Sequence, residues 1–160
     1  MESYMNRISN TGIVPVVKIL EKEDAYPLAK ALLNGGIDVI EVTYRSEHAT
    51  SAIQTISEQL PDMLVGAGTV LSVEQAKEAV EAGAKFIITP GFNTKVVQWC
   101  LNHDVEVYPG VSTASEVEMA LSMGLTQLKF FPAESSGGAK KLKDLSAPYA
   151  NVHFMPTGGI

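Results

Sequence analysis

Hydrophobic residues along this chain fall into short runs rich in valine, isoleucine and phenylalanine, each followed by a segment of different periodicity. The runs lie at residues 12–19, 38–45, 63–70, 85–92, 105–112, 127–134 and 152–160. Their spacing of roughly 20 to 25 residues is about the length of one strand followed by one helix. The pattern therefore predicts seven strands with helices between them.

The segments between the runs carry apolar residues three and four positions apart, as one face of a helix requires. Glycines end several of these segments, and side chains that cap helix starts precede them. The predicted caps are Ser72 with Gln75 and Thr113 with Glu116, and a further helix is expected to begin near Asn93 or Thr94. The predicted stops are Gly35–Gly36, Gly83 and Gly124. A further helix is expected over 137–146, although it opens with two glycines.

Strands that alternate with helices predict a parallel sheet, which could be a closed barrel or an open doubly wound sheet. An open sheet with a nucleotide site usually has a glycine-rich turn after its first strand, whereas residues 20–24 contain no glycine. Polar or special residues instead follow several different strands, as the active site of a barrel requires. These residues are Arg45, Thr69, Pro90 and Thr157. We therefore expect a (β/α) barrel of the TIM type.

Composition narrows the class of protein. The chain has 160 residues, of which 46% are hydrophobic and 19% charged, so it can bury a core and is not disordered. A formal net charge of −6 with only two arginines argues against a nucleic-acid partner. The single cysteine excludes an intramolecular disulfide, and the three histidines lack metal-ligand spacing. Without a long apolar run or a signal-peptide layout, we expect no membrane contact and a cytoplasmic location.

Lys129 is the most informative residue, because it lies in the middle of the apolar run Leu128–Pro132. Strand alternation places Lys129 and Phe131 on one face and Leu128 and Phe130 on the other. Burial favours the neutral form of an amine, which can then attack a carbonyl and form a Schiff base. The alternative is a structural lysine whose ammonium group reaches water.

Glu41, Thr43 and Arg45 share one face of the run 38–45 by the same alternation. A carboxylate in a partly apolar barrel interior could relay protons, and a terminal arginine could bind an anion through paired hydrogen bonds. The alternatives are an ion pair of Glu41 with Lys129 or Arg45, and a surface role for Arg45. A lysine and a glutamate that point inward from separate strands favour catalysis.

Thr157, Gly158 and Gly159 follow the last predicted strand. In barrels, the loops after the seventh and eighth strands often bind phosphate through backbone N–H groups, and glycines let the ligand approach closely. A phosphate site at this position is therefore one interpretation, and an ordinary turn is the other.

Six ordered motifs together resemble the class I 2-keto-3-deoxy-6-phosphogluconate (KDPG) aldolase / 4-hydroxy-2-oxoglutarate aldolase family, from about residue 10 to the end of the chain. The motifs are Glu41–Arg45, Gly66–Thr69, Thr89–Gly91, Pro109–Thr113, Lys129–Glu134 and Pro156–Gly159. The resemblance implies a (β/α)8 barrel, a homotrimer, and a lyase of the Entner–Doudoroff pathway that uses neither metal nor cofactor.

The resemblance also implies residue roles. Lys129 would be the Schiff-base lysine and Glu41 the proton-transfer residue. Arg45 and Thr69 would contact the carboxylate or phosphate region of the substrate. The pyruvate pocket would be shaped by Pro90 and Phe131, and its mouth and phosphate side would be lined by Thr157, Gly158 and Gly159.

The length adds a further expectation, because barrels of this type usually have about 200 residues or more. We expect residues 1–160 to form a single barrel domain truncated after the seventh strand, without the eighth strand and last helices that the resemblance implies. A related pyruvate Schiff-base lyase, acting on the galactonate epimer or decarboxylating oxaloacetate, and an inactive fragment are the alternatives.

Overall fold

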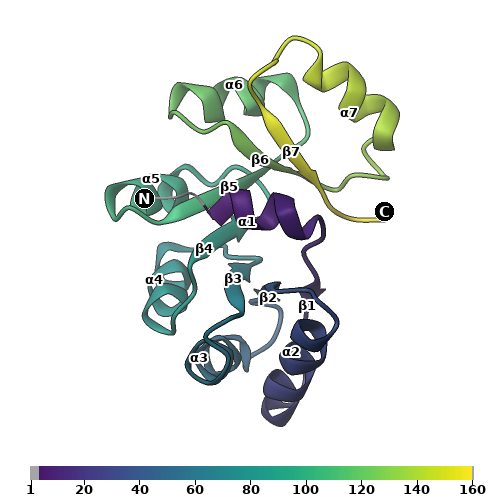
Figure 1. Ribbon diagram of the computed structural model, residues 1–160. Coiled ribbons are helices and arrows are strands. Elements are labelled where there is room, and N and C mark those ends of the chain that lie inside the picture. The colour runs from purple at the N-terminus through teal and green to yellow at the C-terminus, as the bar shows by residue number, and fades with distance from the viewer. Residues whose placement is uncertain (1–3, 160) are drawn as a thin grey trace.

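A computed structural model describes residues 4–159, and its seven strands form one parallel sheet in which each strand pairs with the next along the chain (Figure 1). The strands are β1 (Val16–Val17), β2 (Val39–Thr43), β3 (Leu64–Gly68), β4 (Phe86–Thr89), β5 (Glu106–Val111), β6 (Gln127–Phe130) and β7 (His153–Pro156). This sequential order confirms the barrel-type architecture, because the strand order of a doubly wound sheet reverses part-way across. The described strands curl into a partial barrel.

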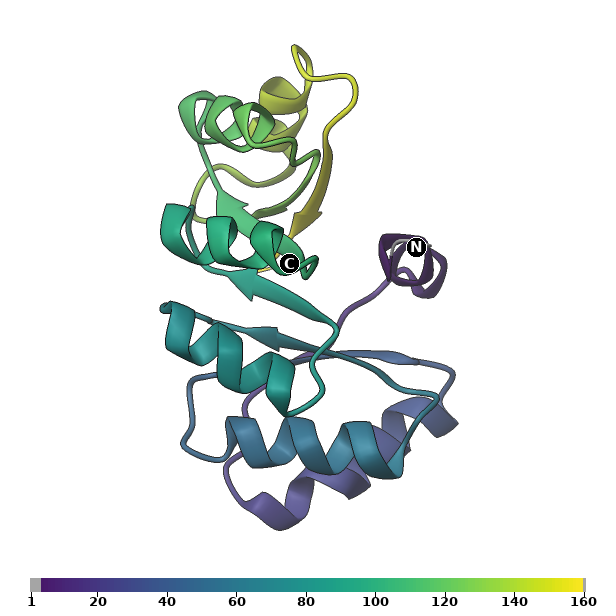
Figure 2. The ribbon, with the colours of Figure 1, turned by 90° about the vertical axis from the view of Figure 1, so that its left-hand side faces the viewer.

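Helices connect the strands on the outer side of the curled sheet (Figure 2). They are α2 (Ala25–Asn34, after the short 3₁₀ turn Lys22–Asp24), α3 (Ala49–Gln59), α4 (Val73–Glu81), α5 (Thr94–Asn102), α6 (Ala114–Ser122) and α7 (Gly138–Ser146). Each of the expected helices is therefore confirmed. Thr113 and Glu116 form the predicted capping box. Ser72 caps α4 as predicted, because its hydroxyl accepts a hydrogen bond from the Gln75 N–H at 3.2 Å, but the Gln75 side chain accepts from the backbone of Leu71 and so does not complete the box.

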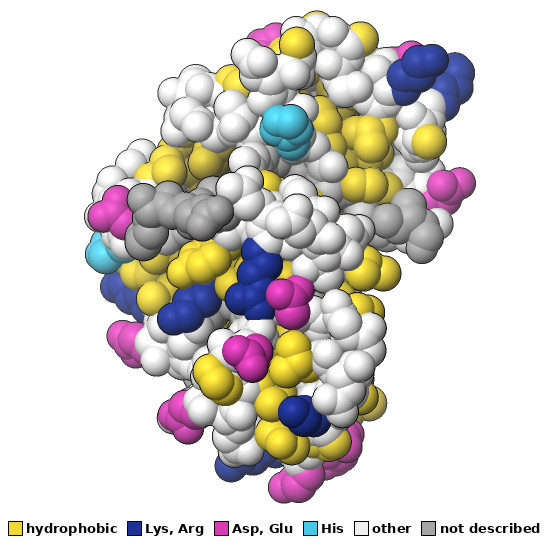
Figure 3. All heavy atoms as spheres, in the orientation of Figure 1, with side chains coloured by type: hydrophobic (Ala, Val, Ile, Leu, Met, Phe, Trp, Pro, Cys, Tyr) yellow, Lys and Arg dark blue, Asp and Glu magenta, His cyan; other side chains and the backbone are white. Residues whose placement is uncertain are grey.

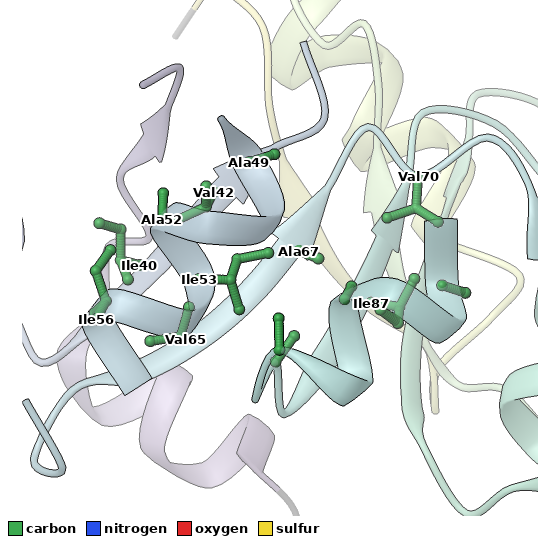
Figure 4. Packing of buried hydrophobic residues seen from close by; sticks show 14 of the residues in the cluster. Ile40, Val42, Ala49, Ala52, Ile53, Ile56, Val65, Ala67, Val70 and Ile87 are labelled. Carbon is green, nitrogen blue, oxygen red and sulfur yellow. The ribbon is translucent and has the colours of Figure 1, made fainter. Parts of the chain in front are cut away.

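Alternation along the strands separates two apolar layers. Ile40 and Val42 of β2 face outward and pack against α3 together with residues of β3 and β4, as Figure 4 shows. Val39, on the opposite face, belongs to an inner cluster that includes Phe86 of β4 and Ile8. The sheet is therefore apolar on both faces over most of its length, as expected for parallel strands covered on both sides.

Helix α1 (Tyr4–Thr11) was not predicted from the sequence, and it lies on the inner side of the sheet, opposite the other helices (Figure 2). Arg7 Nε lies 2.7 Å from Asp38 Oδ2, just before β2. The hydroxyl of Thr11 donates to Asp38 Oδ1 at 2.6 Å. These contacts, the hydrogen bond from Thr11 foremost, lower the pKa of Asp38. Helix α1 is thereby held against the amino end of β2.

The face that carries α1 mixes charges of both signs with uncharged side chains, and no continuous basic patch is visible on it (Figure 3). Among residues 4–159, no helix is long and apolar enough to cross a membrane.

Cys100 of α5 is fully buried, and burial raises the pKa of its thiol to about 12. A thiol with so high a pKa forms little of the reactive thiolate at neutral pH. We expect a disulfide reagent such as dithionitrobenzoate to label the native protein more slowly than a free thiol by a factor of about 100 or more. The same reagent should label one thiol per chain in denaturant. Rapid labelling of the native protein, followed spectrophotometrically, would contradict this burial.

Candidate active site

The predicted site residues lie within strands or just beyond their carboxyl ends, and because the strands are parallel these ends share one edge of the sheet. Glu41 and Lys129 lie within β2 and β6. Arg45, Thr69, Pro90, Phe131 and Thr157–Gly159 follow β2, β3, β4, β6 and β7.

The central feature is the contact between Lys129 and Glu41. Lys129 Nζ lies 3.5 Å from Glu41 Oε1, and the two residues are only 4% and 1% exposed. In a flat sheet β2 and β6 would be four strand spacings apart, about 19 Å. Curvature of the sheet therefore brings the two side chains together across its inner face. The structure confirms the predicted facing of both residues, since Leu128 and Phe130 pack in the outer core instead.

Burial dominates the electrostatics of Glu41. It raises the pKa of the carboxyl, while the nearby charges of Lys129 and then Arg45 act in the opposite direction. A buried carboxyl with a raised pKa can take up and release a proton at a pH nearer neutrality than an exposed glutamate can. The pair thus places an amine next to a carboxyl group with a raised pKa.

Gly68 supplies the space that Glu41 occupies. It faces the inside of the sheet at the end of β3, where a Cβ atom would lie 1.9 Å from Glu41 Oε1. Gly66, two residues earlier, similarly leaves room for the ring of Phe86. Both glycines belong to the motif Gly66–Thr69, but the sequence alone indicates no role for them, because their importance depends on side chains of other strands.

Replacing Gly68 by alanine is expected to displace the Glu41 carboxylate from Lys129. We expect the unfolding free energy to fall by about 1 to 3 kcal/mol, because extra atoms in a filled core force neighbours to shift. Any activity that depends on the Lys129–Glu41 contact should fall more than the population of folded protein does. Gly91→Ala is the stability control, since a Cβ there has no heavy atom within 4 Å. Equal denaturation midpoints for the two variants would contradict the close fit at Gly68.

Phe131 connects Lys129 with the loop after β7. The Lys129 ammonium nitrogen lies 5.2 Å from the centre of the Phe131 ring, within cation–π range. A Cβ built on Gly158 would lie 3.3 Å from the same ring. Lys129, Phe131 and Gly158 therefore share one small region.

The loop after β7 is held by backbone hydrogen bonds. Thr157 and Gly158 accept hydrogen bonds from the N–H groups of Ala133 and Glu134, at 2.8 and 3.0 Å. Gly158 and Gly159 adopt φ values of 99° and 81°, which favour glycine over other residues. This part of the chain is thus a defined loop beside Phe131.

Thr69 and Pro90 lie further along the same edge. Thr69 adopts a φ of 55°, a left-handed conformation that is rare for a β-branched residue and typical of functional sites. Pro90 lines a cleft of about 720 Å³ between the loops that follow β3 and β4. The remaining lining residues are Val70, Leu71, Thr89 and 91–95.

Arg45 is held beside the site by a hydrogen bond to Thr43. Thr43 lies on the predicted polar face of the strand, but it was not predicted to be a site residue. Arg45 Nε donates to Thr43 Oγ1 at 3.0 Å, and the Thr43 hydroxyl donates to the carbonyl oxygen of Val17 at 2.8 Å.

Among residues 4–159, no cluster of three or more His, Cys, Asp or Glu side chains is placed to hold a metal ion.

Comparison with known protein families matches residues 4–160 to the aldolase family described as KDPG and KHG aldolase. The chain belongs to this family. The match includes every predicted site residue, from Glu41 to Gly159. The buried Lys129–Glu41 pair therefore lies within the part of the chain that matches the KDPG and KHG aldolase family.

Relatives in this family match most of the chain. A 2-dehydro-3-deoxy-phosphogluconate aldolase of Treponema pallidum (strain Nichols) is 48% identical over 160 residues, which cover 100% of this chain and 76% of the relative. The KHG/KDPG aldolase of Escherichia coli (strain K12) is 45% identical over 154 residues, covering 96% and 72% of the two chains.

A solved structure supports the same assignment. The KDPG aldolase of Legionella pneumophila, with pyruvate captured at low pH as a covalent carbinolamine intermediate, is 44% identical. It superimposes with a TM-score of 0.89 over 92% of this chain and 71% of its own. The curled parallel sheet of this chain therefore has the same fold as the Legionella pneumophila enzyme over the part that superimposes.

Proposed function

We propose that this chain is a Schiff-base aldolase that cleaves KDPG to pyruvate and glyceraldehyde 3-phosphate, and 4-hydroxy-2-oxoglutarate (KHG) to pyruvate and glyoxylate. The observation that carries the proposal is the buried Lys129 amine 3.5 Å from the Glu41 carboxylate. The names of the Treponema pallidum and Escherichia coli relatives support the two substrates.

In the first step Lys129 Nζ passes a proton to Glu41, 3.5 Å away, and the amine so formed attacks the C2 ketone of the substrate. The addition gives a carbinolamine, and loss of water gives an iminium ion. Glu41 is placed to supply and remove the protons of this step, because it lies beside Nζ and its burial raises its pKa. The positive iminium then acts as an electron sink.

In the second step the C3–C4 bond breaks, and its electron pair moves into the iminium to form an enamine. Glu41, through a water molecule, accepts the C4 hydroxyl proton, and the aldehyde product leaves. The same carboxyl group then protonates C3 of the enamine. Water hydrolyses the resulting iminium, which releases pyruvate and restores the Lys129 amine.

The anionic ends of the substrate need separate partners. Arg45 and Thr69 are proposed to bind the carboxylate or phosphate region, and Pro90 and Phe131 to shape the pyruvate pocket. Thr157, Gly158 and Gly159 are proposed to line the mouth on the phosphate side. The loop geometry beside Phe131 and the guanidinium at the end of β2 support these roles.

The test of the proposed function is reductive trapping. Incubation with pyruvate and borohydride should attach the mass of one reduced pyruvate adduct to Lys129, as located by peptide mass spectrometry. The chain should also unfold cooperatively, and pyruvate should raise its melting temperature. A folded chain without an adduct would contradict the proposal, and a chain that does not unfold cooperatively would favour an inactive fragment.

Substrate choice within the class needs a direct comparison. The specificity constant kcat/KM should be highest for KDPG or KHG. A higher value for the galactonate epimer, or for decarboxylation of oxaloacetate, would assign the chain to a related pyruvate Schiff-base lyase. The homotrimer, the cytoplasmic location and a single domain spanning residues 1–160 stay predictions, and analytical ultracentrifugation would test the first.

A further inference from the structure

Thr43 is a fully buried polar residue to which none of the proposed steps gives a role. It is the last residue of β2, two positions before Arg45, and its side chain is 0% exposed. Its hydroxyl lies between two partners, the carbonyl oxygen of Val17 at 2.8 Å and Nε of Arg45 at 3.0 Å.

The chemistry of these partners determines the direction of both hydrogen bonds. A guanidinium Nε–H can only donate, and a carbonyl oxygen can only accept. The single hydroxyl proton of Thr43 must therefore point to Val17, which leaves an oxygen lone pair for Arg45. The carbonyl of β1 thus holds the hydroxyl in the orientation in which it accepts from Arg45.

Arg45 needs such an anchor because it follows the end of the strand and is itself exposed. A free arginine side chain samples many rotamers, and much of that freedom is lost when it binds an anion. A bond at Nε restricts the guanidinium while both terminal Nη groups remain available for paired hydrogen bonds to a carboxylate or phosphate.

We propose that Thr43 is a positioning residue that orients Arg45 toward the anionic group of the substrate. This role rests on the proposed function of the site, because it assigns Arg45 to substrate binding. Thr43 acts through Arg45 and does not touch the reacting atoms.

The first test follows Arg45 directly and needs no activity. Thr43→Val removes the hydroxyl, whereas Thr43→Ser retains it. The Nε–H proton of Arg45, observed by ¹⁵N NMR, should exchange with water about 10-fold faster in Thr43→Val and at the native rate in Thr43→Ser. An unchanged exchange rate in Thr43→Val would overturn the proposal. Thr43→Ala, which removes the hydroxyl without adding any atom, repeats the test if the valine variant does not fold.

The second test is a double-mutant cycle with Arg45→Ala. Thr43→Val alone should raise KM for the cleaved substrate about 10-fold and change kcat by less than about 3-fold. In the Arg45→Ala background the same substitution should have almost no further effect, because its target is gone. A purely structural role would lower kcat/KM by the same factor in both backgrounds and would overturn the proposal.

The two proposals fail in different ways. A wild-type chain that forms no pyruvate adduct contradicts the aldolase function, yet the exchange rate of the Arg45 Nε–H proton still tests the anchor. Conversely, a normal adduct with unchanged Arg45 exchange in Thr43→Val contradicts only the positioning role.

Discussion

Replacing Lys129 by methionine is expected to abolish aldol cleavage, with a fall in kcat/KM on the order of 10⁴ or more. Methionine is unbranched and apolar, so it can occupy the buried position, but it has no amine to form a Schiff base. The rate of KDPG cleavage is measured from the amount of pyruvate released. The variant should also acquire no mass when it is treated with pyruvate and borohydride.

A surface lysine provides the matched control. Lys77→Met on α4 makes the same chemical change at an exposed position, and it should leave both the rate and the adduct unchanged. The Lys129→Met variant leaves Glu41 buried without its cation, which costs stability, and Lys129→Met with Glu41→Gln should restore part of it. Cleavage at more than about one hundredth of the native rate by a folded Lys129→Met variant would exclude Lys129 as the nucleophile.

Replacing Glu41 by glutamine is expected to lower kcat by about 10² to 10⁴ while a pyruvate adduct on Lys129 can still be trapped. Glutamine has nearly the same shape but cannot carry the proton between water and the enamine. The exchange of pyruvate methyl hydrogens with deuterated water, followed by NMR, isolates that proton transfer and should slow with kcat. Glu81→Gln, at the exposed end of α4, is the matched control. Native methyl exchange in Glu41→Gln would assign the proton transfer to another group.

The raised pKa of Glu41 gives this prediction a pH signature. As a base Glu41 must be ionised, so kcat/KM should fall as the pH drops through a value above the 4.5 of an ordinary glutamate. Stability changes in the opposite sense, because the folded protein holds this proton more tightly than the unfolded chain does. The contribution of Glu41 protonation to the free energy of unfolding is fully present below pH 4.5, and it is lost as the pH rises through the raised pKa of Glu41. Glu41→Gln should remove both dependences.

Much of the fold could be predicted because each repeat carries local signals. The period of apolar residues located every strand from β1 to β7 and the helices between them, and the glycines and caps located several helix ends. Helix α1 escaped prediction because it is only eight residues long and mostly polar, and its apolar face consists of Tyr4, Met5 and Ile8 alone. Its position depends on Asp38, 27 residues beyond Thr11 in the chain.

The candidate site likewise contains residues that the sequence could place and contacts that it could not. Alternation along β2 and β6 was enough to place Glu41 and Lys129 on inward faces, and the ordered motifs were enough to suggest the chemistry. Two features had no such signal. The room that Gly68 leaves for Glu41, and the hydrogen bond from Thr43 to the carbonyl oxygen of Val17, depend on how neighbouring strands are paired and how far each side chain reaches.

The sequence by itself thus determined the order of elements, the faces of the strands and the residues able to do the chemistry, because these depend on periods of two and of about 3.6 residues. The tertiary structure alone decided that Lys129 and Glu41, 88 residues apart, meet at 3.5 Å. That contact arises from the curvature of the whole sheet, which sums small twists between successive strands. A local pattern of residues encodes each strand, but the distance across the curved sheet depends on the geometry of all the strands between β2 and β6.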